Sequence, residues 1–489
     1  MDVSVREQKI GLFGSVMIGA TCMVGSGWLF APLIAAQLAG NYAFLSWIVS
    51  AAFILAVAFC FIYGFVKYPY RGITARIISI THNSSFGLPF AFVNWFGIIA
   101  TVSTEAQAST QYLAFYLGEA FATPDGLTIY GKLLGVVLLC LFLLVNYFGI
   151  RFLAKINNIV TIIKFATPVI VLIALVIAHF AFSNFTDTVP EKPHDMSSIL
   201  VAMIGAGMIY SFNGFQTIGS FAGEIEKPER NLALAFFISV ILVLVFYLII
   251  QFVFMAAMPA SYLTGGWENV QLTSPMINLT AILGLHIMSL LLIINAVVSP
   301  SATGFTYLGS SARMLSGMSH QKQAPKFLQK MCPKYHFSKT SMVTNFIVAL
   351  IFFLNSSGWA NLMVTVAIFN IMSYMAAPIS MGALKKHRFI GWIVFLLICG
   401  LIATADHENI VLTCEALVVV AVIFIFTNGL NKAWFNFLSV LPFYILLFAG
   451  FYTDNMIAIL ILASIFYWFS ISDFFIQFCK KHKEEIHVG

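Results

Sequence analysis

The chain has 489 residues, of which 60% are hydrophobic and only 9% are charged. A soluble domain carries about 25% charged residues, so this composition excludes a soluble globular protein and predicts an all-α polytopic membrane protein. The seven cysteines are scattered and form no Cys-x-x-Cys pair, so neither a disulfide framework nor a metal site is expected. No cofactor is expected either.

The first apolar run, residues 12–39, is long enough to cross a bilayer. Its middle reads Val24-Gly25-Ser26-Gly27, where glycine weakens a helix and leaves backbone groups unpaired. Unpaired backbone at membrane depth is tolerated only where protein or a water-filled cavity receives it. Two interpretations stay open here. One is a broken helix whose free amides bind an anion, and the other is a close helix-packing contact through small residues.

Further apolar runs bring the predicted total to about fourteen spans. They lie near residues 12–39, 43–66, 88–118, 131–150, 156–181, 198–222, 232–257, 276–312, 341–355, 360–383, 389–405, 410–428, 433–451 and 454–478. The total depends most on the split of residues 389–428 at Asp406-His407-Glu408, so twelve spans is the alternative.

The distribution of basic residues tests this topology. With the N-terminus inside, all of the 25 lysines and arginines except Lys132, Lys164 and Lys192 lie in cytoplasmic segments. That bias is what the positive-inside rule predicts for a multi-pass protein of the plasma (bacterial inner) membrane with both termini cytoplasmic. The net charge of +6 therefore reflects topology and contact with anionic lipids of the bilayer, and no nucleic-acid partner is expected.

The sixth predicted span contains a second candidate break, Tyr210-Ser-Phe-Asn-Gly-Phe-Gln216, which is polar and contains glycine at mid-depth. Each candidate break opens a group of five spans. In both groups an ordinary span, a polar or amphipathic connector and an unusually long third span follow. With five spans per unit the second copy must be inverted, which is the pattern of an inverted-repeat secondary transporter. The predicted organisation is a core at 1–390, with repeats at 12–181 and 198–383, and additional C-terminal spans at 389–479.

Five motifs in this order resemble the amino acid–polyamine–organocation (APC) transporter superfamily over roughly residues 10–390. They are Val24-Gly-Ser-Gly-Trp-Leu-Phe30, Asn146-Tyr-Phe-Gly149, Asn213-Gly-Phe-Gln216, Gly223-Glu-Ile-Glu-Lys-Pro-Glu-Arg-Asn231 and Ser311-Ala-Arg-Met-Leu315. Two positions depart from the family pattern. Gln216 stands where many relatives carry an acidic residue, which leaves side-chain specificity open, and Gln323-Ala-Pro325 stands where relatives often have Gly-x-Leu-Pro.

The resemblance implies substrate contacts at both breaks. Amides at the first break would hold a substrate carboxylate, and carbonyls at the second would hold its ammonium, in agreement with the polarity of half-helix ends. The substrate-binding residues expected on this basis are Val24, Gly25, Ser26, Gly27, Tyr210, Phe212, Asn213 and Gly214. Tyr210, Phe212 and Phe215 flank the second break, so they are expected either to gate the substrate or to pack in the core.

Two ionisable residues inside the predicted spans are candidates for function, because a charge at the bilayer centre costs about 2.5–3.5 kcal/mol. Glu105 lies among small and polar neighbours in the third span and is expected to line the substrate site, the alternative being a protonated side chain bonded to another helix. Lys164, in the fifth span, either snorkels to the cytoplasmic face or, as the resemblance implies, takes the place of a sodium ion. Since burial disfavours its charged form, we expect Lys164 to couple transport to protons.

Two further ionisable residues are expected to be structural. His286 falls within the predicted eighth span, where a hydrogen-bonded packing role is the expectation. Glu415 falls in the twelfth, outside the repeat, and a packing or oligomer contact is expected there.

A chain of many apolar spans is compatible with three classes of function. The sequence favours secondary active transport of an amino acid or related amine by alternating access, proton-coupled, with an amino acid or amine exchanger (antiporter) as the alternative. A proton-translocating subunit of a membrane complex would need a longer chain of ionisable residues across the mid-plane. An intramembrane enzyme is not expected, because the chain has no His-Glu-x-x-His and no Gly-x-Ser-x-Gly motif. The substrate and the oligomeric state stay open.

Overall fold

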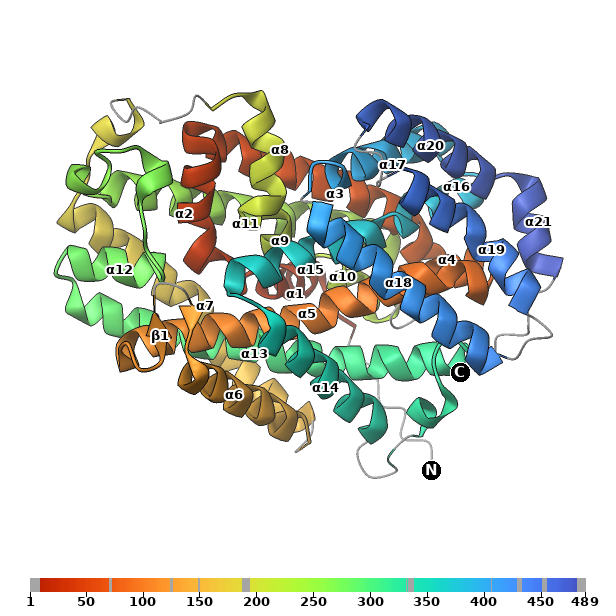
Figure 1. The fold of residues 1–489 in the computed structure, drawn as a ribbon, viewed down its shortest axis with the longest axis horizontal. Coiled ribbons are helices and arrows are strands. Elements are labelled where there is room, and N and C mark those ends of the chain that lie inside the picture. Colours follow the sequence, from red (N-terminus) through yellow and green to blue (C-terminus); the bar gives the residue numbers. More distant parts are fainter. Residues whose placement is uncertain are drawn as a thin grey trace.

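The computed structural model describes residues 9–69, 73–123, 126–147, 150–186, 194–330, 332, 338–405, 407–428, 433–450 and 455–481. This part of the chain consists mainly of helices, with one antiparallel pair of two-residue strands, β1 (Ala122–Thr123) and β2 (Gly126–Leu127), in a loop (Figure 1).

The helices of the first half are apolar and separated by short loops. They are α1 (Leu12–Met23), α2 (Gly27–Ala39), α3 (Ala43–Lys67), α4 (Ile73–Thr81), α5 (Ser84–Leu117), α6 (Ile129–Tyr147), α7 (Ile150–Ala178), α8 (Met196–Gly205), α9 (Met208–Ser211), α10 (Thr217–Ser220) and α11 (Pro228–Ala257).

The second half continues in the same way. Its helices are α12 (Pro275–Ile282), α13 (His286–His320), α14 (Lys339–Asn355), α15 (Trp359–Tyr374), α16 (Ala376–Ala383), α17 (Arg388–Ile402), α18 (His407–Asn428), α19 (Ala433–Ile445), α20 (Met456–Ser470) and α21 (Asp473–Lys481). Short 3₁₀ turns lie at Gly40–Tyr42, Phe182–Phe185, Ala222–Glu224, Ala260–Tyr262, Trp267–Asn269 and Lys326–Gln329, and a π-helical turn at Leu446–Gly450.

Within the described residues, six helical segments are long and apolar enough to cross a membrane. They are Gly27–Lys67, Ser84–Ala114, Ile129–Tyr147, Pro228–Ala257, His286–His320 and Trp359–Ala383. Met456–Ser470 and Asp473–Lys480 make a seventh if this pair, bent by 58°, is one span. Shorter apolar helices occupy most of the remaining predicted spans, so the total of fourteen stays a prediction.

Helix α5 lies at the centre of the molecule, packed mainly against α13 and α15 (Figure 1). It begins at Ser84, where the Asn83 side chain accepts a hydrogen bond from the Phe86 amide at 2.7 Å and so satisfies one free donor of the first turn. The helix is buried on nearly all sides, and between residues 97 and 110 it carries mostly small residues, which let α13 and α15 approach closely. The C-terminal helices, blue in Figure 1, gather at one end of the molecule.

The predicted eighth span is wrong in one respect, because it is not continuous. The first helix of this region ends at Ile282, and Gly284 adopts a left-handed conformation (φ +70°) before α13 begins at His286. His286 is therefore exposed at the first position of a helix, and the packing role expected for it inside a span does not hold.

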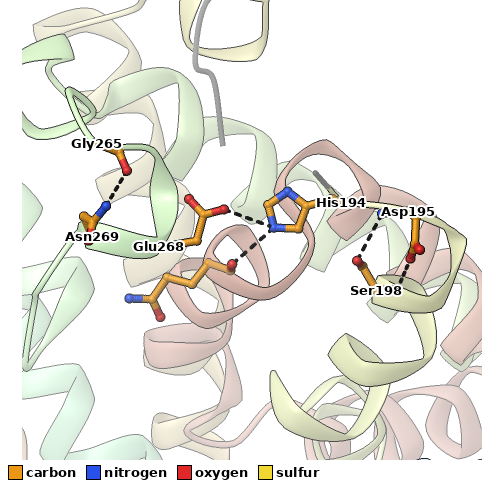
Figure 2. A network of polar contacts seen from close by, with 7 residues as sticks. His194, Asp195, Ser198, Gly265, Glu268 and Asn269 are labelled. Carbon is orange, nitrogen blue, oxygen red and sulfur yellow. Dashed lines mark hydrogen bonds and ion pairs between the residues drawn. The ribbon is translucent and has the colours of Figure 1, made fainter. Parts of the chain in front are cut away.

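A polar network joins the ends of several segments away from the centre (Figure 2). His194 lies between the Glu268 carboxylate (Nε2 to Oε1, 3.6 Å) and the Gln37 carbonyl oxygen (3.3 Å), and Gln37 Nε2 donates to the Val270 carbonyl at 2.8 Å. Next to it, Asp195 caps α8 by accepting from the Ser197 amide at 2.8 Å. These contacts tie the end of α2 to the start of α8 and to the segment before α12.

Candidate functional site

The first predicted break is present in the structure. Helix α1 ends at Met23 and α2 begins at Gly27, so Val24, Gly25 and Ser26 lie between two half-helices. The Met23 carbonyl, freed at the end of α1, accepts a hydrogen bond from the Tyr247 hydroxyl of α11 at 3.1 Å. The surrounding protein thus receives backbone groups that lipid could not satisfy.

Glu105 of α5 lies directly against this break. Its Oε1 accepts from the Tyr210 hydroxyl at 2.6 Å and from the Ser26 amide at 3.4 Å. A Cβ atom added to Gly25 would lie 2.5 Å from the same oxygen, so glycine is required for the carboxylate to approach. Glu105 Oε2 is buried and has no hydrogen-bond partner among the described residues. The break therefore holds a carboxylate that has one oxygen occupied and one available.

The hydroxyl groups around Glu105 form a chain of hydrogen bonds with a fixed direction. The Trp359 indole nitrogen, which can only donate, donates to Ser26 Oγ at 2.9 Å. Ser26 Oγ lies 3.2 Å from the Tyr210 hydroxyl, and that hydroxyl donates to Glu105. Because the Tyr210 hydroxyl has one hydrogen and donates it to Glu105, the Ser26 hydroxyl is the donor to Tyr210. The whole chain points toward the Glu105 carboxylate.

The sixth predicted span is also interrupted, and its interruption touches the first break. Gly207 and Gly214 adopt left-handed conformations (φ +73° and +106°) on either side of α9. A Cβ atom at Gly214 would lie 2.8 Å from the Cys22 carbonyl oxygen and 2.8 Å from the Tyr307 hydroxyl. Only glycine allows both this conformation and this approach.

The other residues expected at the second break have mixed roles. The carbonyls of Tyr210 and Phe212 each accept a turn hydrogen bond, from Asn213 N at 2.9 Å and Phe215 N at 3.4 Å. An ammonium would have to use their second lone pair. Asn213 Nδ2 donates to Thr101 Oγ1 at 3.4 Å, and Asn213 Oδ1 accepts from Gln216 Nε2 at 3.0 Å. Gln216 Oε1 in turn accepts from the backbone N–H of Gly214 at 3.2 Å. Gln216, the departure from the family pattern, thus folds back onto the break.

Lys164 of α7 is buried, with 3% of its surface exposed, and its Nζ donates to Thr303 Oγ1 of α13 at 2.7 Å. The ammonium also interacts electrostatically with the Glu105 carboxylate. A snorkelling lysine would place its ammonium in an exposed position, so this burial argues against that interpretation. The structure brings Lys164 close to the site of Glu105 and the first break.

Glu415 lies outside the site, and the side chains of Phe212 and Phe215 pack in the core beside the second break. Glu415 is exposed on α18 among exposed apolar side chains. Phe215 and Phe212 are fully buried and pack on other aromatic rings, Phe215 on Tyr374 with centroids 5.3 Å apart and Phe212 on Trp47 at 6.1 Å. Within the described part of the chain, no group of His, Cys, Asp and Glu side chains is arranged to hold a metal ion.

Sequence reasoning missed three residues of the site. Trp359 donates to Ser26 and stacks on Phe30 with centroids 4.5 Å apart, Tyr247 satisfies the end of α1, and the buried Tyr307 hydroxyl faces Gly214. Each is an aromatic residue in an apolar run, where the sequence pattern of a gate or cap does not differ from that of core packing.

Two half-helix pairs that meet at a buried polar centre define the class, a membrane transporter core.

Comparisons with known proteins assign the family. A family model described as "Amino acid permease" matches residues 10–451. The chain is 31% identical over 386 residues to the glutamate/serine transporter AimA of Bacillus subtilis (strain 168), covering 78% of this chain and 72% of that protein. It is 28% identical over 382 residues to the aspartate-proton symporter of the same organism, covering 78% and 73%.

The fold resembles a solved transporter at lower sequence identity. The structure of Mhp1, a nucleobase-cation-symport-1 family transporter in a closed conformation with bromovinylhydantoin bound, superposes with a TM-score of 0.56 at 13% identity, covering 95% of this chain and 92% of that chain. The chain therefore belongs to the amino acid permease family of the APC superfamily. It is an integral membrane protein, a transporter of amino acids and not an enzyme.

Proposed function

We propose that the protein carries a short polar or acidic amino acid across the membrane by alternating access, driven by a proton that binds Glu105. The observation that carries this proposal is the position of the Glu105 carboxylate on the amide of Ser26 and the hydroxyl of Tyr210. The first break is thus able to bind a carboxylate. In this structure the Glu105 side chain occupies the place where a substrate carboxylate is expected.

The proton enters the mechanism through competition for these two donors. An ionised Glu105 repels a substrate carboxylate and occupies the donors that it needs. Protonation at Oε2, which is available, removes the negative charge and lets a substrate carboxylate take the Ser26 amide. Proton and substrate then favour each other at one site, and this coupling is reciprocal.

Lys164 is the second part of the coupling. Its ammonium interacts with Glu105, so loss of the negative charge at Glu105 removes one attraction that holds α7 near the break. Its hydrogen bond to Thr303 ties α7 to α13. Protonation and substrate binding at the break thereby change the balance of contacts between these helices, which is what alternating access requires.

The substrate class is supported by relatives rather than by a side-chain pocket. The two relatives described above are named for glutamate, serine and aspartate. In this proposal the substrate ammonium binds the carbonyls around Tyr210, Phe212 and Asn213, as the family resemblance implies. A substrate with an acidic side chain would bring a second negative charge close to Glu105, which makes the protonated form of Glu105 still more necessary.

The larger organisation is part of the same proposal. Residues 1–390 form an inverted-repeat core (12–181 and 198–383), residues 389–479 add C-terminal spans, and both termini face the cytoplasm of a plasma membrane. The interrupted helices at both repeat starts and the bias of basic residues support this arrangement.

The test is uptake of radiolabelled L-serine, L-glutamate and L-aspartate into proteoliposomes, with and without an inward proton gradient. We expect accumulation of at least one of them above equilibrium only with the gradient. If a substrate is swapped for internal amino acid but never accumulated under the gradient, the protein is an exchanger. If none of the three is transported while another amino acid is, the substrate class is wrong.

A further inference from the structure

Two adjoining cavities lie at the end of the molecule where α3 and α16 end, away from the transport site. The larger is a groove of about 500 Å³ lined mainly by apolar and aromatic residues. Its lining residues include Phe59, Ile62, Tyr63 and Val66 of α3, and Ala233 of α11. All five are half-buried, so the groove is an open apolar surface rather than a closed core cavity.

Lysine side chains surround the mouth of this groove. Lys67 and Lys386 line the groove itself, and Lys67 also lines the second cavity of about 230 Å³ together with Lys385 and Lys480. All four lysines are exposed. The two cavities share Lys67 and Leu384, so an apolar compartment and a basic compartment adjoin at these residues.

Other charges near the cavities leave the basic compartment positive. Glu229 lines the groove, and Asp473 pairs with Lys385 at 3.1 Å between exposed side chains. An exposed pair of this kind contributes little and exchanges readily with another anion. The ring of His387 contacts the rings of Phe59 and Tyr63, with centroids 5.9 and 5.2 Å apart, and so packs against the wall of the groove.

The cavities also lie where a membrane surface is expected. Phe237 of α11, one turn beyond Ala233, is 55% exposed, and Phe389 at the start of α17 is 62% exposed. Helix α21, bent by 58° from α20, presents the exposed Phe474 and carries Lys480 near its end. An amphipathic helix of this kind lies along a bilayer surface, with apolar side chains in lipid and lysines at the headgroups.

We propose that these two cavities bind one anionic phospholipid, with an acyl chain in the α3–α11 groove and the phosphate between Lys67, Lys386 and Lys480. An apolar compartment joined to a basic one matches an amphipathic anion, and a zwitterionic lipid lacks the net charge that the lysines attract. The bound lipid connects the ends of α3, α11 and α16, and so stabilises the packing of these helices.

The experiment is thermal unfolding of the full-length protein in mild detergent, without amino acid, after addition of phosphatidylglycerol or phosphatidylcholine. We expect phosphatidylglycerol to raise the melting temperature and phosphatidylcholine to have a much smaller effect. The double variant Lys67→Gln/Lys386→Gln should bind phosphatidylglycerol roughly fivefold more weakly for each charge removed. The matched control, Lys326→Gln/Lys330→Gln, removes two exposed lysines that line neither cavity and should respond like wild type.

A second variant tests the apolar compartment without changing charge. Ala233→Trp fills the groove and should abolish the difference between the two lipids, and native mass spectrometry should show one retained phosphatidylglycerol on wild type that this variant lacks. Equal stabilisation by phosphatidylcholine, or a full response in both test variants, would overturn the proposal. Stabilisation by glycerol 3-phosphate equal to that by phosphatidylglycerol would show a phosphate site without a lipid, and would overturn it as well.

Discussion

The hydroxyl of Tyr210 lies 2.6 Å from Oε1 of Glu105, although 105 residues separate them in sequence. This contact joins the second broken span to α5, and the Ser26 amide at 3.4 Å from the same oxygen joins the first. One carboxylate thus connects both breaks. A change in its charge changes the contacts of two interrupted helices at once.

Gly25→Val is expected to weaken substrate binding while the protein still inserts and folds. Even the Cβ atom of the new side chain would lie 2.5 Å from Glu105 Oε1, so Glu105 and the break must move apart. We expect apparent affinity to fall roughly tenfold or more, equivalent to about 1.4 kcal/mol. The measurement is substrate-induced thermal stabilisation. Gly317→Ala, where an added Cβ meets nothing within 4 Å, is the control, and unchanged affinity for Gly25→Val would mean that the break only packs helices.

Gly214→Ala is expected to destabilise the protein by roughly 1–3 kcal/mol, because the residue has φ +106° and its Cβ would meet the Cys22 carbonyl oxygen. Gly284→Ala provides a matched control, since its φ of +70° carries the conformational cost but its Cβ meets nothing within 4 Å. The melting temperature should fall further for Gly214→Ala than for Gly284→Ala. Equal losses would show that the contact between the two breaks contributes nothing.

Lys164→Met should lose accumulation driven by a proton gradient while keeping exchange of internal for external substrate. Methionine fills a similar volume but cannot carry the charge that interacts with Glu105. The companion variant, Thr303→Val, removes the 2.7 Å hydrogen bond and leaves the charge in place, so it should keep gradient-driven accumulation at a lower rate. Full accumulation by Lys164→Met would assign Lys164 a structural role.

The orientation of the chain is tested by cysteine labelling in a cysteine-free background. Lys326→Cys, in the exposed loop after α13, should react with a membrane-impermeant maleimide only after the membrane is opened. Thr264→Cys, in the exposed segment between α11 and α12, should react in intact cells. The reverse pattern would invert the proposed topology.

The sequence alone located both breaks, because glycine beside polar residues at mid-span conflicts with a simple apolar helix. It also identified Glu105 and Lys164, since each charged residue in lipid needs a partner. It did not reveal which partners they have. The partners depend on how α5, α7 and α13 pack against one another, and this packing is set by contacts between parts of the chain that are distant in sequence.

Other features were beyond the sequence for local reasons. The apolar run 276–312 was interpreted as one span because its length and composition do not show that Gly284 adopts a left-handed conformation (φ +70°). Trp359 and Tyr247 were not recognised, because an aromatic residue that hydrogen-bonds to a break has the same sequence neighbours as one that only packs. Their roles follow from backbone groups that a broken helix exposes, and those groups are visible only in the folded protein.

The central claim is that protonation of Glu105 admits the substrate carboxylate, and one variant tests it most directly. Glu105→Gln keeps the size and one hydrogen-bond acceptor of the side chain but cannot bind or release a proton. In proteoliposomes under an imposed proton gradient, wild type should accumulate substrate. Glu105→Gln should bind substrate and exchange it, yet reach only equilibrium whatever the gradient. Accumulation by Glu105→Gln to the wild-type level would contradict the account.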